Sequence, residues 1–499
     1  MVCHSFLLSK EPGHSRIFIT HMKTVSLDQL TAGARRAGSI INEGRNCGGC
    51  HLAKRAAVLV DGEAYFTRLS QCLAKAQQSI FIVAWDFDAA IRLVPTESDQ
   101  TVGTLLRSLV DSRPDLHVRV LVWSEATIHA PGATLPLLLG DDWSDHPRIR
   151  VELDKRHPLY AAHHQKIVSI DDQIAFVGGM DLTVDRWDTP EHANDCAYRV
   201  KPDGTPYKPV HDVQMIVEGE AAGALAAIAR QRWKAVTGED VASGFIDSAL
   251  WPDGLQAQFT NVSIAVSTIF PRWRGQVGCS QSFQMTVDAI AAARNSIYLE
   301  AQYFTSRRIG RVIAQSLAKP EGPEILVVVG LNSHGFIEHY VMGRNRDRLA
   351  RRLKNRDPYG RFRIYYPKLP SGKDLTLHSK IMVIDDTFLR VGSSNLNNRS
   401  EGLDTECDVS VEAINDETSA MIANVRDTLL AEHLGVDASR VRRVVSDERS
   451  LFRAVDRLNV NARRLETIPG LSEKGPISPV VGTWLLDPAR PFLSRFRFG

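Results

Sequence analysis

One short pattern of polar residues occurs twice in this chain and constrains its fold more than any other feature. It reads His-x-Lys-x4-Asp in both copies, and six residues later a Gly-Gly or Gly-Ser pair follows. The motif residues are His164, Lys166 and Asp171 in the first copy and His378, Lys380 and Asp385 in the second. Because the continuation recurs with the motif, the pattern indicates an internal duplication.

The residues within each copy predict a buried strand that ends in a turn. Residues 166–170 and 380–384 are largely apolar and rich in β-branched side chains, and an Asp-Asp pair follows each run. Side chains two positions apart share one face of a strand, so the His and Lys of each copy are expected to converge on one small anion. We expect the Asp of each motif to hold the turn or pair with a lysine rather than to react.

The duplication extends upstream of both motifs. Apolar residues recur at helical spacing over residues 63–78 and 281–294, and β-branched runs at 117–123 and 324–329 predict further strands. Equivalent landmarks lie 214 to 217 residues apart. This order of helices and strands predicts an α/β fold with a sheet in each half.

A third correspondence lies downstream, where Asp212 and Glu406 begin matched apolar strands. A catalytic imidazole needs an acceptor at its second ring nitrogen, so we assign these carboxylates to orient the motif histidines. His163 and His211 have no counterparts in the repeat and are expected behind the site at most. The first half also carries an extra loop at residues 188–209, a candidate cover for a site.

The length of 499 residues is enough for two domains of about 200 residues each. The expected divisions are a poorly ordered extension (1–46), a first half (47–245), a linker (246–275), a second half (276–435) and a C-terminal extension (436–499). Sixty basic and 58 acidic side chains give a net charge of +2, which demands no polyanionic partner. Arginine clusters at 344–363 and 440–443 are interpreted as solvated surface, with contact to nucleic-acid or lipid phosphates as the alternative.

No apolar run reaches the roughly 18 to 20 residues that cross a bilayer, and the first 46 residues lack a cleavable signal pattern. We therefore expect no transmembrane segment and a soluble or peripheral protein. A cytoplasmic location is the default, and secretion without a cleaved signal is the alternative. The sequence does not indicate an oligomeric state.

Seven scattered cysteines predict reduced thiols rather than a disulfide framework. Cys47, Cys50 and His51 match the C-x-x-C-H pattern of covalent haem attachment, but no export signal accompanies them, and a loop before the first strand is the preferred interpretation. Zinc binding by this pair is disfavoured because no second pair follows at finger spacing. We expect no cofactor and no catalytic metal.

The paired motifs match the needs of phosphodiester cleavage, which requires charge neutralisation, an in-line nucleophile and a proton for the leaving oxygen. Lys166 and Lys380 are expected to hold the nonbridging oxygens, with Ser393 and Asn395 as hydrogen-bond donors. One neutral imidazole attacks phosphorus and the other, protonated, donates to the leaving alcohol, through a covalent phosphohistidine. The residues alone do not distinguish the two histidines.

These residues resemble the phospholipase D superfamily, whose members carry His-x-Lys-x4-Asp-x6-Gly-[Gly/Ser] in duplicate. The likeness spans about residues 55–435. Four phrases are similar to the phosphatidylcholine-type branch: Gly178-Gly179-Met180-Asp181-Leu182, Arg186-Trp187-Asp188-Thr189, Glu300-Ala301-Gln302-Tyr303-Phe304 and Gly392-Ser393-Ser394-Asn395-Leu396-Asn397.

The resemblance implies two α/β/α sandwich domains related by pseudo-twofold symmetry, with a single active site at their interface. It also implies that His164 is the nucleophile and His378 the general acid. Asp181 stands where the second half has Asn395, and an ionised carboxylate cannot donate a hydrogen bond. Direct phosphate contact by Asp181 is therefore not expected.

The function implied is a phospholipase D that hydrolyses a glycerophospholipid at a membrane surface, with phosphatidylcholine as the expected substrate, to phosphatidate and free headgroup. Phosphatidyl transfer of the cardiolipin synthase type uses the same intermediate and is the first alternative. A nuclease of the same superfamily and a haem electron-transfer protein are the others. The near-neutral charge argues against a nucleic-acid partner.

Overall fold

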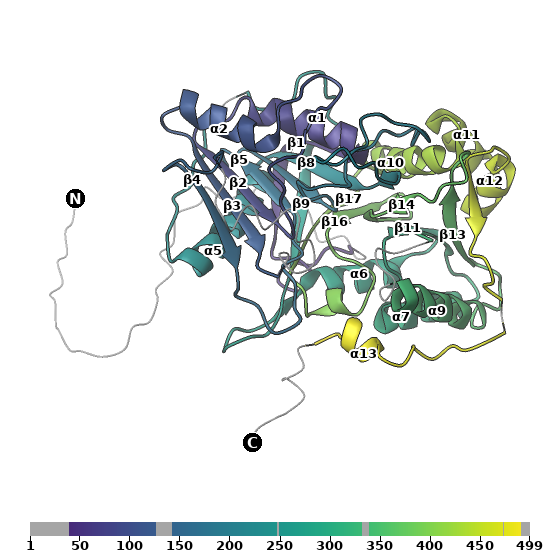
Figure 1. The fold of residues 1–499 in the computed structure, drawn as a ribbon. Helices are drawn as coiled ribbons and strands as arrows, with labels where there is room; N and C mark the ends of the chain where they lie inside the picture. The colour runs from purple at the N-terminus through teal and green to yellow at the C-terminus, as the bar shows by residue number, and fades with distance from the viewer. Residues whose placement is uncertain (1–38, 126–141, 247–248, 332–338, 473, 491–499) are drawn as a thin grey trace, which may run out of the picture. The chain divides into compact units, whose positions relative to one another are not determined.

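The computed structural model describes residues 39–125, 142–246, 249–331, 339–472 and 474–490. Of the predicted N-terminal extension, residues 1–38 lie outside the described residues. Ile40–Gly499 forms one compact unit, and most of its strands join in one 16-stranded sheet (Figure 1).

The order of strands in this sheet is symmetric about its central antiparallel pair, β1 and β9. From the centre outward, the N-terminal half-sheet contains β1 (Gly49–Val60), β8 (Val213–Gly219), β6 (Ile174–Gly178), β5 (Ile167–Ile170), β2 (Ser79–Ala84), β3 (His117–Trp123) and β4 (Ile149–Asp154). In the same sense, the C-terminal half-sheet contains β9 (Phe259–Phe270), β17 (Glu406–Glu412), β16 (Phe388–Gly392), β15 (Lys380–Ile384), β11 (Ser296–Ala301), β12 (Glu324–Val329) and β13 (Phe362–Lys368). Each strand has its counterpart at the same position, as a duplicated chain requires.

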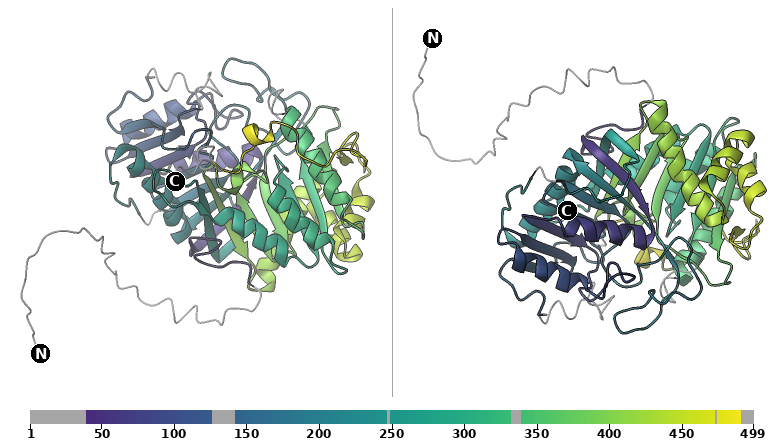
Figure 2. Two further views of the ribbon diagram at one scale, coloured as in Figure 1. Left: turned by 90° about the horizontal axis from the view of Figure 1, so that it is seen from below. Right: turned by 90° about the horizontal axis from the view of Figure 1, so that it is seen from above.

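Helices cover both faces of the sheet (Figures 1 and 2). One face packs against α1 (Asp61–Leu73), α2 (Val102–Ser112), α6 (Gln281–Ala292), α7 (Arg307–Leu317) and α9 (Arg344–Lys354). The opposite face packs against α5 (Glu220–Thr237), α10 (Asp416–Leu434), α11 (Ala438–Glu448) and α12 (Leu451–Leu458). Strand side chains alternate between the layers, since Ile80 and Phe81 enter opposite cores.

Smaller elements complete the fold. They are β18 (Arg464–Thr467) beside β13, β10 (Cys279–Ser280) beside β9, the parallel pair β7 (Val210–His211) and β14 (Thr376–Leu377), η2 (His339–Gly343), η3 (Arg399–Glu401) and α13 (Thr483–Leu486). No described helix has the length and apolar character needed to span a bilayer. The Cys47 side chain is buried in the turn before β1, and all six described cysteines are free thiols.

The predicted elements agree with the observed ones except at helix ends. Strands predicted at 117–123 and 324–329 coincide with β3 and β12, whereas the helix predicted over 63–78 already ends at Leu73. Three backbone N–H groups just beyond that end donate to a motif aspartate, so the chain turns there into β2. The segment expected as a linker, 246–275, contains β9. The domain boundaries themselves stay a prediction.

Candidate active site

The two motif histidines lie where equivalent strands, β5 and β15, begin. The His164 backbone N–H donates to the carbonyl of Thr405 at 3.0 Å, and the His378 N–H donates to the carbonyl of His211 at 2.8 Å. Each motif therefore runs beside the segment that leads into a strand of the opposite half-sheet. This pairing brings the two copies of the motif to one interface.

Each histidine is held by a carboxylate from the other half of the chain. His164 Nδ1 lies 2.9 Å from Glu406 Oε2, and His378 Nδ1 lies 2.6 Å from Asp212 Oδ2. Both carboxylates are buried. With Nδ1–H donated to a carboxylate, the Nε2 atom of each imidazole carries the lone pair.

The two carboxylates have different surroundings. Glu406 also accepts hydrogen bonds from the hydroxyls of Ser393 and Ser400, both at 2.6 Å. Asp212 accepts the backbone N–H of Val213 at 2.8 Å, and a Cβ at Gly179 would lie only 2.1 Å from its Oδ1 atom. Ser393 and Gly179 are equivalent in the repeat, so the first copy needs the glycine to make room for its carboxylate.

Both motif lysines are buried beside their histidines but differ in their partners. Lys166 Nζ forms an ion pair with Asp181 Oδ2 at 2.9 Å. Lys380 Nζ donates to Gln302 Oε1 at 3.1 Å and to the carbonyl of His378, both uncharged groups. Burial, together with the charge of Lys166, lowers the pKa of Lys380 to about 7.

Burial and the two ammonium groups shape the electrostatics of the histidines. Burial first, then Lys166 and Lys380, lower the pKa of His164 well below its usual value. The pKa of His378 is lowered in the same direction by burial and by both lysines. Burial raises the pKa of the Glu406 carboxyl to about 7. Each lysine thus acts on both imidazoles, and a bound anion would offset this positive charge.

The motif aspartates lie away from the imidazoles and hold the backbone. Asp171 accepts the N–H groups of Gln77, Gln78 and Ser79 at 2.7 to 2.8 Å. Asp385 accepts the three equivalent N–H groups of residues 294–296, each at 2.7 Å. Each carboxylate therefore fixes the turn between a helix and the following strand in its half.

Models of known families match both halves of the chain. The model described as "Phospholipase D" matches residues 147–265, and the model described as "Cardiolipin synthase, PLD-like domain" matches residues 286–425. Each match contains one copy of the motif. The chain belongs to the phospholipase D superfamily. The family predicted from the duplicated motif is confirmed.

Curated relatives of this superfamily member are similar over much of its length. Phospholipase D gamma 2 of Arabidopsis thaliana is 24% identical over 74% of this chain and 61% of its own length. Phospholipase D A of Dictyostelium discoideum is 24% identical over 76% of this chain and 35% of its own length. The chain therefore spans less than two thirds of these relatives.

A solved structure has the same fold. The phosphatidylserine synthase of Haemophilus influenzae Rd KW20 matches with a TM-score of 0.52 at 14% identity, over 76% of this chain and 88% of the other. This likeness, with the symmetric sheet, confirms the predicted phospholipase D fold. At this identity the match concerns the fold alone.

The residues predicted to bind phosphate differ from one another in their hydrogen-bond partners. The Ser393 hydroxyl is used by Glu406, whereas the Asn395 side-chain oxygen is buried without a hydrogen bond to any described residue. Asp181 accepts the backbone N–H of Trp85 at 2.9 Å in addition to its ion pair with Lys166. Lys166, which was predicted to hold a phosphate oxygen, is therefore paired with the Asp181 carboxylate in this structure.

Two residues near the histidines belong to family-like phrases of the sequence but had been assigned no role in the site. Ser400 bonds Glu406, and the charge of Arg186 acts on His378, Lys380 and Asp212. The two stand 214 residues apart, at equivalent positions of the repeat. Aligning the two halves at the 214-residue spacing of the motif histidines would have identified both, because Arg186 follows Gly178-Gly179 by the same interval as Ser400 follows Gly392-Ser393.

Proposed function

We propose that this superfamily member is a phospholipase D that hydrolyses a glycerophospholipid to phosphatidate and a free headgroup. The supporting observation is the crossed arrangement in which each motif histidine is held by a carboxylate of the other half, beside a buried lysine. Two imidazoles whose Nε2 atoms have no hydrogen bond to a described residue, together with two ammonium groups, are the groups that a metal-independent displacement at phosphorus requires.

In the first step, Nε2 of His164 attacks phosphorus, in line with the bond to the headgroup oxygen. A protonated His378 gives its proton to that oxygen as the P–O bond breaks, and the headgroup alcohol leaves. The phosphatidyl group is then bonded to His164 as a phosphohistidine. Glu406 stabilises the positive charge on the imidazole because it accepts the Nδ1–H.

In the second step, His378 Nε2 removes a proton from water, and the oxygen attacks phosphorus. The P–N bond breaks, His164 regains its lone pair, and phosphatidate is released. Asp212 holds His378 in position for both proton transfers. Lys166 and Lys380 neutralise the nonbridging oxygens throughout.

Phosphatidyl transfer to an alcohol is the second candidate, and the match of the second half to a cardiolipin synthase model favours it. The two reactions share the phosphohistidine and differ only in whether water or an alcohol attacks. Phosphatidylcholine is the proposed substrate, presented at a membrane surface. A peripheral protein is the form that suits this substrate.

The test incubates the purified protein with mixed phospholipid vesicles and a short primary alcohol, and identifies products by mass. Phosphatidate and free headgroup are expected, with phosphatidylalcohol where the alcohol competes with water. His164→Ala and His378→Ala should each reduce turnover by several orders of magnitude. Cleavage of DNA or RNA without phosphatidate formation would assign the protein to the nucleases.

A rapid quench separates the roles of the two histidines. The proposal predicts a transient mass increase of one phosphatidyl group on the peptide that contains His164. His378→Asn should still form this adduct slowly with a substrate whose leaving group needs no proton, such as a p-nitrophenyl ester. An adduct on the His378 peptide would reverse the assignment.

A further inference from the structure

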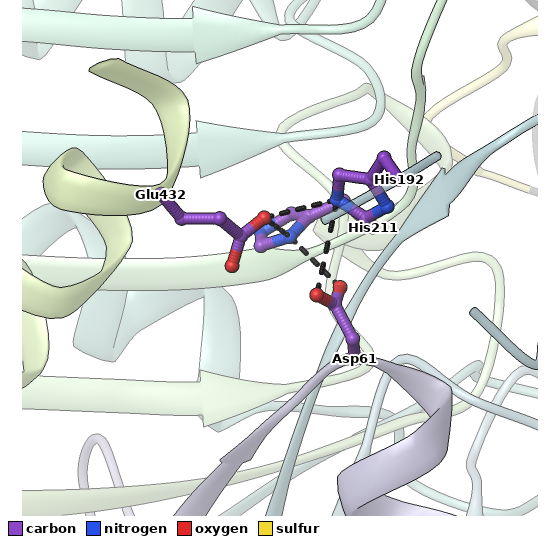
Figure 3. Close-up of side chains that lie close together, drawn as sticks. All are labelled: Asp61, His192, His211 and Glu432. Atoms are coloured by element: carbon purple, nitrogen blue, oxygen red, sulfur yellow. Dashed lines mark hydrogen bonds and ion pairs between the residues drawn. The ribbon is translucent and has the colours of Figure 1, made fainter. Parts of the chain in front are cut away.

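Two histidines and two carboxylates converge in a buried cluster behind the motif of the second half. They are Asp61 at the start of α1, His192 in the loop after β6, His211 in β7 and Glu432 in α10 (Figure 3). One ligand atom of each residue lies within 4.8 Å of the others. The proposed mechanism uses none of these four side chains.

The distances within the cluster fit ligands around one metal ion. His211 Nδ1 lies 3.0 Å from Asp61 Oδ1 and 2.9 Å from Glu432 Oε1. His192 Nε2 lies 3.0 Å from Glu432 Oε1 and 3.8 Å from Asp61 Oδ2. A tetrahedral ion with bonds of 2.0 to 2.1 Å would place its ligands about 3.4 Å apart, within the observed spread.

Asp61 provides an independent indication of a cation site. Its side chain is fully buried, yet neither carboxylate oxygen has a hydrogen bond to any described residue. The Nδ1 atom of His211 likewise has no hydrogen bond of acceptable geometry in the described part of the chain. His211 Nδ1 and Asp61 Oδ1 lie 3.0 Å apart as an ion pair but outside good hydrogen-bond geometry, and a buried carboxylate without well-aligned donors is costly. An ion at their centre would satisfy all of them.

The outer contacts of both histidines are those of metal ligands. His192 Nδ1 lies 2.9 Å from Asp188 Oδ2, and His211 Nε2 lies 3.0 Å from Glu300 Oε2. Histidine ligands usually give their second ring N–H to a carboxylate, which fixes the ring and the tautomer. Asp188 is itself paired with Arg199 at 2.9 Å, and Glu300 accepts the Ser379 hydroxyl at 2.6 Å. The outer carboxylates are therefore fixed as well.

We propose that Asp61, His192, His211 and Glu432 bind a divalent transition-metal ion, with Zn²⁺ as the preferred ion. Two carboxylates balance its charge, and four protein ligands make a closed structural site rather than a catalytic one. Three ligands come from the N-terminal half and Glu432 from α10, so the ion ties the two halves together. The backbone N–H of Asp61 also donates to the carbonyl of Asp212 at 2.8 Å, which connects the site to the carboxylate that holds His378.

The first experiment measures the metal content of the full-length protein, purified without chelator, by mass spectrometry of the elements. One bound ion per chain is expected. Asp61→Asn and Glu432→Gln keep the side-chain shape but should lose the ion, and Asp188→Asn should weaken binding by about 10- to 100-fold. Glu218→Gln is the matched control, because Glu218 is also a buried carboxylate, paired with Arg55 at 2.5 Å at the far end of β8. Its metal content should not change.

A second measurement uses the wild-type chain and so does not depend on variants that fold. After removal of metal with a chelator, Zn²⁺ should raise the melting temperature, Mg²⁺ should not, and Co²⁺ should give the visible spectrum of a tetrahedral site. A protein with no bound ion, no spectrum and no thermal shift would overturn the proposal and leave a cluster of protonated histidines and carboxylates. None of these readouts needs turnover, so they are independent of the proposed function.

Discussion

His164 Nδ1 lies 2.9 Å from Glu406 Oε2, a carboxylate that begins β17 in the other half of the chain. His378 and Asp212 make the reciprocal contact at 2.6 Å. Neither half alone contains a motif histidine together with its acceptor. The duplicated chain therefore forms one site rather than two, and each carboxylate can be tested through the histidine of the opposite half.

Glu406→Gln should reduce kcat on the order of 10³- to 10⁴-fold, because a carboxamide neither fixes the His164 tautomer nor stabilises its positive charge. In the parent protein, kcat/KM should fall as the pH decreases below about 7, since the pKa of Glu406 is about 7. His164, whose pKa is lowered, titrates only at more acidic pH. The variant should lack this acidic limb, the fall in kcat/KM below about pH 7. The measurement uses a soluble short-chain substrate from pH 5 to 9.

Glu401→Gln is the control for that experiment. Glu401 is a buried carboxyl that accepts the Ser306 hydroxyl at 2.7 Å and bonds neither motif histidine. Its replacement should leave the limb near pH 7 in place. A limb that persists in Glu406→Gln would assign the titration to another group.

The same carboxyl should make stability depend on pH. Burial raises the pKa of folded Glu406 from 4.5 to about 7, so its stabilising protonated form is fully present below pH 4.5 and is lost as the pH rises through 7. The loss amounts to at most about 3 kcal/mol. The free energy of unfolding of Glu406→Gln minus that of the parent should therefore be larger at pH 8 than at pH 5. Urea unfolding of both proteins at the two pH values measures this difference, and equal differences would contradict the shift.

Gly179→Ala adds a side chain, and Ser393→Gly removes one, at equivalent positions of the repeat. A methyl group at residue 179 would overlap Asp212 Oδ1 and displace the acceptor of His378, which should lower kcat on the order of 10²-fold. Ser393→Gly should cost less, because Glu406 keeps its bonds to Ser400 and His164. Steady-state kinetics, with melting temperatures to confirm folding, compares the two variants. Equal losses would show that the glycine is not needed for clearance.

Asp171→Ala should destabilise the fold more than Asp385→Ala does. Both carboxylates accept three backbone N–H groups, but Asp171 is fully buried and Asp385 is partly exposed. We expect losses of about 3 to 5 and about 1 to 2 kcal/mol, respectively, from denaturant unfolding. Asp99→Ala, at a highly exposed carboxylate, is the control. Retention of kcat within about tenfold in the folded fraction of both variants would fit a structural role.

The sequence predicted those features that local patterns encode. The strands at β3 and β12 and the family follow from residue periodicity and the repeated motif. The helix end at Leu73 did not follow, because a carboxylate almost a hundred residues later accepts the N–H groups beyond it. Such a tertiary hydrogen bond leaves no mark at the helix itself.

The site was predictable as a list of residues but not as an arrangement. Asp212 and Glu406 were identified from the repeat, whereas their exchange between halves depends on how the two half-sheets join through β1 and β9 at the centre of the sheet. Ser393 was expected to donate to phosphate, but its hydroxyl donates to Glu406 at 2.6 Å. No local sequence motif marked His192 and Glu432, because the ligands of the proposed metal site come from four separate elements.

Arg186 should contribute to phosphate binding rather than to the chemical step. Its charge lowers the pKa of both His378 and Lys380, which places it within electrostatic reach of the site, and its Nε atom is buried with no hydrogen-bond partner in the described chain. Arg186→Ala should raise KM for a soluble phosphodiester by about tenfold and weaken inhibition by inorganic phosphate similarly, since one charged hydrogen bond is worth about 1.5 to 3 kcal/mol. Arg186→Lys keeps the charge and should recover part of both. A loss of kcat with unchanged KM in Arg186→Ala would instead assign the guanidinium to stabilising the transition state.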